Sequence, residues 1–473
     1  MITDLKPYAE YRESGLPWLG QVPGHWEVKR PKQIGALLKG IGGTKEDSRS
    51  AGVPCVRYGE LYTTHHYFIR RPKAFIEATR AFAYTPIRYG DVLFAASGEK
   101  LDEIGKSAVN LIDGDAVCGG DTIVLRPRIN VHAPFLGYAF DCRPSALQKA
   151  IRGRGTTVKH IYPDEVKQLQ IPLPPPDEQA AIVRFLDWAN GRLERAIRAK
   201  RKVIALLNEQ KQAIIHRAVT RGLDPSVPLK DSGVPWLGEI PKHWEVRRAK
   251  YLFREVDERS VDGGEELLSV SHLTGVTPRS QKNITMFKAA SYAGHKLCRP
   301  GDLVVNTMWA WMGALGVSTY AGIISPAYAV YRPRLSEKVV GIFLDGLLRS
   351  RPYVANIICR STGLRASRLR LYPEEFFRLP VILPPVDEQL RIVESIEAET
   401  SDLSTAISRL EREITLLREY RTRLVADVVT GKLDVRAAAA ALPDDVPLDI
   451  AEPMDEEMVD LEGEVEAQGE GEK

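Results

Sequence analysis

The sequence predicts a mixed α/β protein in which two repeated α/β domains are separated by two long helices. These helices are expected to form an antiparallel coiled coil with pseudo-twofold symmetry. Three observations support this fold class: a long internal repeat, short β-like segments bounded by Gly and Pro in each copy, and a heptad stripe after each copy. The chain has 473 residues, 44% hydrophobic and 27% charged, which fits a globular protein of two or three domains.

The internal repeat is long and collinear. Residues 14–30 read SGLPWLGQVPGHWEVKR and residues 232–248 read SGVPWLGEIPKHWEVRR, which are identical at twelve of seventeen positions. Further along, IYPDEVKQLQIPLPPPDEQ at 161–179 is matched by LYPEEFFRLPVILPPVDEQ at 371–389. Between these segments the copies agree only at scattered points. The repeat therefore predicts two domains of one fold, whose interiors differ either in binding specificity or through neutral drift of an old duplication.

Each copy contains short strand-like and helix-like segments in a mixed order. The strands are expected at 53–58, 91–95, 121–125, 267–271, 302–306 and 328–331, and short helices at 134–141 and 339–348. The resulting organisation is a first domain at 14–176, a long helix at 177–222, a second domain at 232–386, a second long helix at 387–434 and an acidic tail at 441–473.

A proline-rich junction precedes each long helix. Asp177 and Asp387 follow these prolines and are expected to act as N-caps, with Glu178 and Glu388 in the first turn. Apolar residues then recur on alternating steps of three and four over roughly 40 residues, or about 60 Å of helix. The stripe favours pairing of the two helices, although helices that merely complete two separate cores are the alternative. The polar interruptions of the stripe are Asn190, Lys200, Lys211 and Arg421.

The net charge of +3 is unevenly distributed. Residues 441–473 contain thirteen acidic residues and one basic residue, whereas residues 1–440 contain 64 basic and 49 acidic residues, a net charge of +15. The composition predicts a disordered acidic tail and a basic folded part. A basic body is compatible with a polyanionic partner, but many basic proteins have none.

The sequence argues against membrane insertion, disulfide scaffolding and structural zinc. It has no run of eighteen apolar residues and no secretory signal at its start, so a cytoplasmic protein without a membrane partner is expected. Its cysteines are few, widely spaced and without a CxxC pair. They are Cys55, Cys118, Cys142, Cys298 and Cys359.

Motifs for catalysis are missing from the sequence. It has no Asn-Pro-Pro-Tyr methyltransferase motif, no GxGxxG after a strand and no GxxxxGK[ST] phosphate loop. The segment PDEVK at 163–167 resembles a PD-(D/E)xK nuclease fragment, but the second copy replaces Lys167 by Phe377, so acidic residues at a helix start are the preferred interpretation. The sequence therefore predicts a non-catalytic binding protein with no catalytic, cofactor or metal residues.

These motifs together resemble the specificity (S) subunit of type I restriction–modification systems. The likeness rests on the GLPWLG…HWEV opening, the GDVLFAASGE and GTTVKHIYPDEV segments, and the junction between IPLPPPDEQ and the long helix, and it covers residues 14–434. It implies that the two domains are target recognition domains, each reading one half of a bipartite double-stranded DNA site. It also implies that the coiled coil acts as a ruler and binds two methyltransferase (M) subunits, and that restriction (R) subunits join through the complex.

The resemblance further implies that S-adenosylmethionine, ATP and Mg²⁺ are held by the partner subunits rather than by this chain. The acidic tail is a departure from the family pattern. The residues leave two alternative functions: a coiled-coil adaptor whose twin domains bind proteins, and an autonomous nuclease.

Two basic, hydroxyl-rich segments are the best DNA-binding candidates, because side chains of this kind contact phosphates and base edges. Each segment comes just before the repeated Tyr-Pro, and a solvated surface loop is the alternative. The candidates are Arg152, Arg154, Thr156, Thr157, Lys159 and His160 in the first domain, and Arg360, Ser361, Thr362, Arg365, Ser367 and Arg368 in the second.

Weaker candidates lie elsewhere in both domains. They are Arg57, Tyr58, Ser97, Gly98, Glu99, Lys100, Ser271, His272, Asn306, Trp309 and Trp311. The basic face of the first long helix, Arg192 to Lys202, could follow the DNA backbone or form a salt-bridged helix surface.

Overall fold

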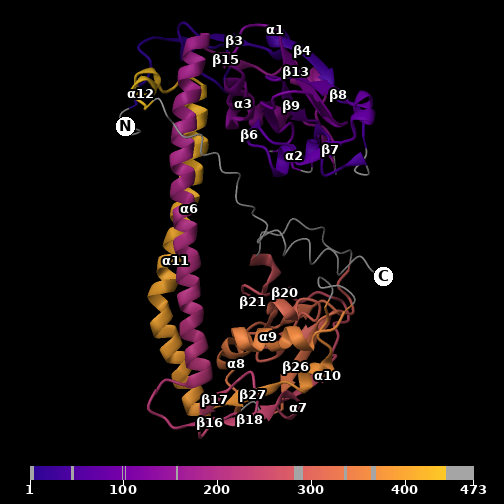
Figure 1. The fold of residues 1–473 in the computed structure, drawn as a ribbon, viewed down its shortest axis with the longest axis vertical. Helices are drawn as coiled ribbons and strands as arrows, with labels where there is room; N and C mark the ends of the chain where they lie inside the picture. Colours follow the sequence, from indigo (N-terminus) through magenta and orange to yellow (C-terminus); the bar gives the residue numbers. More distant parts are fainter. Residues whose placement is uncertain are drawn as a thin grey trace. The chain divides into compact units, whose positions relative to one another are not determined.

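The computed structural model describes residues 5–43, 47–98, 100–101, 103–155, 158–281, 291–334, 338–363 and 369–443. These residues form two compact units (Figure 1). Unit 1 contains the described residues up to Lys200 together with 412–443, and unit 2 contains those between 201 and 411. The units differ from the predicted domains because each includes one end of both long helices, whose apolar side chains complete its core.

A five-stranded sheet organises unit 1. Its order is β4 (Gly35–Lys39), β13 (Thr122–Pro127), β9 (Val92–Ala95), β11 (Ser107–Asn110) and β6 (Tyr67–Ile69), and only β11 and β6 are parallel. Side chains alternate across β9, as a strand requires. Val92 and Phe94 join the core that contains the helices, and Leu93 and Ala95 join a core on the opposite face.

A second sheet of unit 1 covers that opposite core. Its order is β7 (Ala74–Ile76), β5 (Val53–Val56), β12 (Ala116–Cys118) and β8 (Thr85–Ile87). The strand expected at 53–58 ends at Val56, because Tyr58 already begins helix α2 (Tyr58–Thr63). Helices α3 (Ala133–Asp141) and α4 (Arg143–Arg152) supply the other face of the five-stranded sheet, where Phe140 meets Phe94 at 5.3 Å between ring centroids.

A lysine is buried in the core of unit 1. The Lys149 ammonium, on α4, donates hydrogen bonds to Phe140 O (2.8 Å) and Ser107 Oγ (3.2 Å) and lies 3.7 Å from Asp141 Oδ1. Burial lowers the pKa of Lys149 to about 8, and the Asp141 carboxylate only partly opposes this change. The second copy has Ile357 at the matching helix position, so the fold does not require a lysine here.

Unit 2 repeats the central part of this architecture. Its four-stranded antiparallel sheet has the order β19 (Phe253–Val256), β26 (Ala329–Pro333), β23 (Leu303–Val305) and β24 (Leu315–Val317). Helices α8 (Gly341–Leu348) and α9 (Arg351–Arg360) follow, as α3 and α4 do in unit 1. Two additional pairs are β20 (Leu268–Ser271) with β21 (Gly275–Pro278) and β22 (Lys296–Cys298) with β25 (Gly322–Ile324).

The repeated sequence motifs form the same structure in both units, which we call the clasp. It consists of a pair of short strands and of a glutamate, in the first turn of the long helix, that contacts a tryptophan and a histidine. Strands β3 (Glu27–Lys29) and β15 (Ile171–Leu173) pair in unit 1, and β18 (Glu245–Arg248) and β27 (Pro380–Leu383) pair in unit 2. In unit 1, Glu178 accepts a hydrogen bond from Trp26 Nε1 (3.1 Å) and contacts His25 Nε2 (2.8 Å). In unit 2 the corresponding distances from Glu388 are 3.1 Å to Trp244 and 2.6 Å to His243. The clasp explains why HWEV and DEQ recur together.

The two long helices begin slightly earlier than the sequence predicted. They are α6 (Pro176–Arg221) and α11 (Val386–Val429). Asp177 and Asp387 are therefore inside the first turn and are not N-caps, which corrects that prediction. The reason is that the carbonyls of Pro175 and Pro385 already accept the first intrahelical bonds, from Gln179 N (2.9 Å) and Gln389 N (3.0 Å). Both carboxylates remain near the positive end of the helix dipole.

In each unit the two helices run side by side in opposite directions (Figure 1). Within unit 2, Lys211 Nζ donates to Ser404 Oγ (2.9 Å), whereas Arg217, farther along α6, lies 3.6 Å from Glu399, earlier along α11. Lys200, Lys211 and Arg421, which interrupt the apolar stripe, thus form polar pairs with the other helix, whereas Asn190 Nδ2 donates to Tyr138 Oη (3.2 Å) on α3. In unit 1 these pairs are Arg421 Nη1 with Glu194 Oε2 (3.1 Å) and Lys200 with Glu413.

The N-terminal and C-terminal parts of the described chain meet in unit 1. Asp434 N donates to Lys6 O (2.8 Å), and Tyr11 Oη donates to Gly431 O (3.0 Å). Val428, Val429 and Val435 are buried in the same core as Trp26. Unit 1 is therefore built from two chain segments, while unit 2 is one continuous segment.

Short elements complete the two units. In unit 1 they are β1 (Tyr11–Glu13), β2 (Gln21–Pro23), α1 (Pro31–Ile34), η2 (Ala78–Ala83), α5 (Pro163–Val166) and α12 (Arg436–Ala440). In unit 2 they are β16 (Leu229–Asp231), β17 (Glu239–Pro241), α7 (Ala249–Leu252), η3 (Arg279–Gln281), η4 (Ala310–Met312) and α10 (Pro373–Phe377). No helix in the described ranges is both long enough and apolar enough to cross a bilayer. Apart from 441–443, the predicted acidic tail lies outside the described residues.

Candidate nucleic-acid interface

The basic segment of unit 1, residues 152–160, is held at the end of the five-stranded sheet. Helix α4 ends at Arg152, and Arg154 and His160 then exchange backbone hydrogen bonds of 2.9 and 2.7 Å. Strand β14 (Lys159–His160) continues this contact by pairing with β10 (Ser97–Gly98). The segment is therefore anchored at both of its described ends, and Thr156 and Thr157 lie outside the described residues.

A glycine permits the tight path of this segment. Gly155 has a φ of +118°, and a Cβ at this position would lie 2.1 Å from Val158 O. Any other residue would strain the backbone and clash with it. Gly155 is therefore required for the defined conformation of this segment.

The cationic side chains of this segment are positioned by protein contacts but remain accessible. Arg154 is 73% exposed, and its Nη2 lies 2.7 Å from Glu165 Oε1. Lys159 Nζ donates to Gly155 O (2.5 Å), and Arg152 Nη1 donates to Gln148 O (2.9 Å). The His160 ring contacts Ser97 Oγ through Nδ1 (3.0 Å). Each cation keeps further N–H groups that can bind a phosphate or a base.

Other candidates from distant parts of the sequence lie next to this segment. Ser97 and Gly98 are the strand partners of β14, and Ala96 N donates to Asp121 O (2.8 Å). Tyr62 Oη donates to Ser97 O (2.8 Å), which places helix α2 against the same strand. Arg57 precedes α2, and within the described part of the chain its Nε and Nη2 are buried without a hydrogen-bond partner. Three predicted clusters thus share one end of the sheet.

Unit 2 holds its basic segment, residues 360–370, by the same construction. Thr362 and Arg370 exchange backbone hydrogen bonds of 2.9 and 2.8 Å. Leu371 N then donates to Thr307 O (2.9 Å), as Ile161 N donates to Ala96 O (2.9 Å) in unit 1. The two copies therefore display different sequences on equivalent supports.

The predicted residues of unit 2 differ in their accessibility. Arg360 is held by Asn356 Oδ1 (2.6 Å from Nε) and by Glu375 Oε2 (3.2 Å from Nη1). Ser361 is buried and donates its hydroxyl to Ile357 O (2.8 Å), so it stabilises the end of α9 and does not face solvent. Thr362 is exposed. Arg365, Ser367 and Arg368 lie outside the described residues.

The weaker candidates of unit 2 have mainly structural contacts. Asn306 is buried, and its Oδ1 accepts a hydrogen bond from Met308 N (3.3 Å). The hydroxyl of Ser271 accepts one from Leu273 N (3.0 Å). The half-buried rings of Trp309 and Trp311 stack on each other at 5.5 Å between centroids. These contacts close turns, and none points to a ligand.

Two exposed tyrosines were missed by reasoning from the sequence. Tyr162 is 53% exposed and Tyr372 is 50% exposed, and each follows its basic segment directly. The Tyr162 ring stacks with His160 at an interplanar angle of 28°. The repeated Tyr-Pro served only as a marker of the repeat, and the exposure of its ring depends on the tertiary fold. Aromatic side chains in such a position are able to contact nucleotides.

The PDEVK segment at 163–167 begins helix α5. Asp164 pairs with Lys167 at 2.7 Å on the surface, and Glu165 Oε2 accepts a hydrogen bond from Tyr162 N (3.2 Å). The carboxylates therefore serve the helix start, as in the preferred interpretation of this sequence. Nowhere in the described ranges do three His, Cys, Asp or Glu residues gather to hold a metal ion.

Comparison with known proteins agrees with this arrangement. The family model for the type I restriction modification DNA specificity domain matches residues 23–201, which include the clasp and the basic segment of unit 1. Over these residues the chain is similar to the specificity subunits of type I restriction enzymes. The match covers most of unit 1 and the first part of α6, and the internal repeat extends the likeness to unit 2.

Relatives in this family cover different shares of the chain. The putative MjaX specificity subunit of Methanocaldococcus jannaschii is 26% identical over 48% of this chain, and the match spans 52% of that relative, about half its length. The EcoKI specificity subunit of Escherichia coli is 20% identical over 88% of this chain and 90% of its own length. A solved chain of a type I R-M system has the same fold, with a TM-score of 0.58 at 19% identity, covering 87% of this chain and 99% of that chain.

Proposed function

We propose that this chain is the DNA-recognition subunit of a type I restriction–modification complex and reads a bipartite double-stranded site. The observation that carries the proposal is the pair of basic segments, 152–160 and 360–370, which are held by the same backbone bonds in both units and differ in sequence. Equivalent supports with different side chains suit two domains that read two different half-sites. The family match favours this function over a protein adaptor.

The side chains divide into two roles in this proposal. Arg154, which is exposed, and Lys159, which is half-buried, are held by neighbouring oxygen atoms and bind phosphates or guanine edges, because cations oriented in this way donate to both. In unit 2, Thr362 and Arg370 occupy the positions of Arg154 and His160, and both are exposed. Tyr162 and Tyr372 contact the sugar or base next to the phosphate.

The long helices set the separation of the half-sites in this proposal. α6 and α11 contain 46 and 44 residues, and a helix rises 1.5 Å per residue, so each is nearly 70 Å long. As an antiparallel coiled coil with pseudo-twofold symmetry, the pair gives equivalent surfaces to two methyltransferase subunits. Restriction subunits join through that complex, and the partner subunits hold S-adenosylmethionine, ATP and Mg²⁺ and carry out the chemistry.

The test begins with mapping of methylated adenines in cells that contain the chain and its partner subunits. A bipartite motif is expected, and the purified complex should bind a duplex with that motif at least about 10³-fold more tightly than a scrambled duplex. Affinity should fall steeply with salt, because phosphate contacts release counterions. An adaptor would give no motif and no preference between the duplexes.

A further inference from the structure

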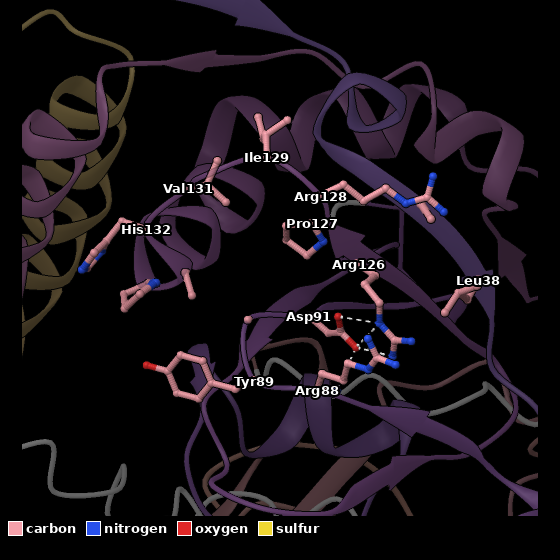
Figure 2. Close-up of a pocket in the computed structure, with 14 residues that line it drawn as sticks. Leu38, Arg88, Tyr89, Asp91, Arg126, Pro127, Arg128, Ile129, Val131 and His132 are labelled. Atoms are coloured by element: carbon pink, nitrogen blue, oxygen red, sulfur yellow. Dashed lines mark hydrogen bonds and ion pairs between the residues drawn. The ribbon is translucent and has the colours of Figure 1, made fainter.

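A cavity in unit 1 concentrates positive charge away from the basic segment. It has a volume of about 670 Å³ and lies where β9 begins and β13 ends, whereas residues 152–160 pair beyond the other end of β9. Figure 2 shows three arginines around it, Arg88, Arg126 and Arg128. Asp91 is the one carboxylate among the residues that line the cavity, and it pairs with Arg126 (2.7 Å, Oδ2 to Nη2). The lining therefore has two more arginines than acidic residues.

Unit 2 contains the same arginine and aspartate arrangement. Asp302 pairs with Arg332 (2.8 Å, Oδ1 to Nε), as Asp91 pairs with Arg126. The aspartates also accept equivalent backbone hydrogen bonds, from Arg88 N (2.8 Å) in unit 1 and from Arg299 N (2.9 Å) in unit 2. Arg88 and Arg126 therefore correspond to Arg299 and Arg332.

The two units differ in what the arginines bind. In unit 2 the Glu258 carboxylate bridges them, with Oε1 2.9 Å from Arg332 Nη1 and Oε2 2.8 Å from Arg299 Nη2. The strand registers place Gly40 of unit 1 at the position of Glu258, and a Cβ on Gly40 would lie 2.0 Å from Thr122 Oγ1. Unit 1 thus has no room for its own carboxylate at this position.

The donors that hold Glu258 in unit 2 are unused in unit 1. Among the described residues, neither Nη1 of Arg126 nor the guanidinium of Arg88 has a hydrogen-bond or ion-pair partner. The Arg128 guanidinium, on the cavity wall, has none either. His132 adds no charge near neutral pH, because burial lowers its pKa. The vacant donors match a carboxylate, which guanidinium groups bind through paired hydrogen bonds.

We propose that carboxylates of the chain's own acidic segment, residues 444–473, occupy this cavity of unit 1. The described chain ends at Pro443 in the same unit, where Arg184 Nη2 donates to Leu442 O (2.8 Å) and Pro443 O (3.1 Å). Arg184 is five residues beyond Gln179 on α6, about 7.5 Å along the axis. Gln179 Oε1 in turn accepts a hydrogen bond from the cavity residue His132 (2.8 Å, from its backbone N).

Length and charge both suit this occupant. Thirty residues extend up to about 100 Å, several times the distance from Arg184 to the cavity rim. Thirteen of them are acidic, so many carboxylates are available to replace the one that Glu258 supplies in unit 2. Docking of the acidic segment lowers the repulsion among the three arginines. High salt is expected to weaken this docking, because salt screens the attraction between the carboxylates and the arginines.

Hydrogen exchange tests the proposal without DNA, so its failure would not affect the proposed function. The full chain is compared with a chain ending at Pro443, which contains every described residue. Residues 86–91 and 126–132 should exchange more slowly in the full chain, and 0.5 M NaCl should remove the difference. Equal exchange in both chains at low salt would overturn the proposal.

A labelled peptide of residues 444–473, added to the shortened chain, tests the residues themselves. Arg88→Ser with Arg128→Ser should weaken its binding more than about tenfold. Arg71→Ser with Arg143→Ser removes the same charge from exposed arginines of unit 1 outside the cavity and should change binding less than about twofold. An equal loss of peptide binding in both double variants would indicate that the peptide is attracted by the overall positive charge of unit 1 and not by the cavity. Loss of DNA binding with unchanged peptide binding would identify a phosphate site. Either result would refute the proposal.

Discussion

Replacing Lys149 by Met should change how the stability of the protein depends on pH. The ammonium is fully buried, and its pKa falls from 10.5 in an exposed lysine to about 8. Each pKa unit corresponds to about 1.36 kcal/mol, so the fold disfavours the protonated form by about 3 kcal/mol. Between about pH 8 and 10.5 the unfolded chain binds more protons than the folded chain, and stability from this residue rises with pH. The expected gain from pH 7 to pH 10 is about 2.5 kcal/mol.

The assay is urea denaturation of the wild-type and Lys149→Met chains at pH 7 and pH 10. The difference in free energy of unfolding between the two chains removes the contribution of other titrating groups. It should move by about 2.5 kcal/mol in favour of the wild type at the higher pH. Lys32→Met, at an exposed lysine of the same unit, is the control. Its difference in free energy of unfolding from the wild type should be the same at pH 7 and pH 10. A pH-independent difference for Lys149→Met would show that the ammonium is not desolvated, and the description of this core would be wrong.

Three further outcomes follow from the proposed recognition subunit. Lys159→Ala or Arg154→Ala should weaken DNA binding while the fold is retained. Loss of a phosphate contact lowers the slope of the log binding constant against log salt concentration by about one, whereas loss of a base contact costs about 1–3 kcal/mol of binding free energy at one base pair of the site. Arg143→Ala is the matched control, and unchanged binding of the first two variants across a salt series would place the interface elsewhere. Exchanging residues 31–160 for those of another family member should change one half of the methylated motif, and a change in both halves would contradict independent domains. Inserting four residues after Leu207 adds about 6 Å of helix and should lengthen the gap between half-sites by one or two base pairs, whereas a two-residue insertion rotates the apolar face by about 200° and should prevent assembly. An active four-residue variant with an unchanged gap would show that the helices do not set the spacing.

The long helices and the repeated architecture were accessible from the sequence because both depend on local, periodic signals. The stripe that predicted a helix over 177–222 marks the face that is partly buried along α6, at positions such as Ile204 and Lys211. Several predicted strands match within one or two residues, including the one observed as β9. The helix start was displaced by a residue, because a carbonyl before the aspartate makes the first hydrogen bond.

The candidate interface was harder to predict from the sequence, because the exposure of its side chains depends on contacts between distant residues. The basic segments were visible as composition, and their equivalent anchoring explains why both precede the same Tyr-Pro. The sequence could not distinguish Ser361, whose hydroxyl turns back to α9, from the exposed Thr362 beside it. Nor could the sequence show that Glu178 accepts a hydrogen bond from Trp26, which lies 152 residues earlier.

The construction of unit 1 from both parts of the chain has a consequence for synthesis on the ribosome. The described residues of unit 2 form one segment, which is complete once position 411 has left the exit tunnel. Unit 1 cannot bury Trp26 against Val428 and Val429 until the last part of α11 is made. Because translation adds about 5 to 20 residues per second, the last part of α11 is made roughly 20 to 90 s after the first strands of unit 1. The unit that is translated first is therefore finished last, and during this interval its apolar face is a target for chaperones or for the same segment of another nascent chain.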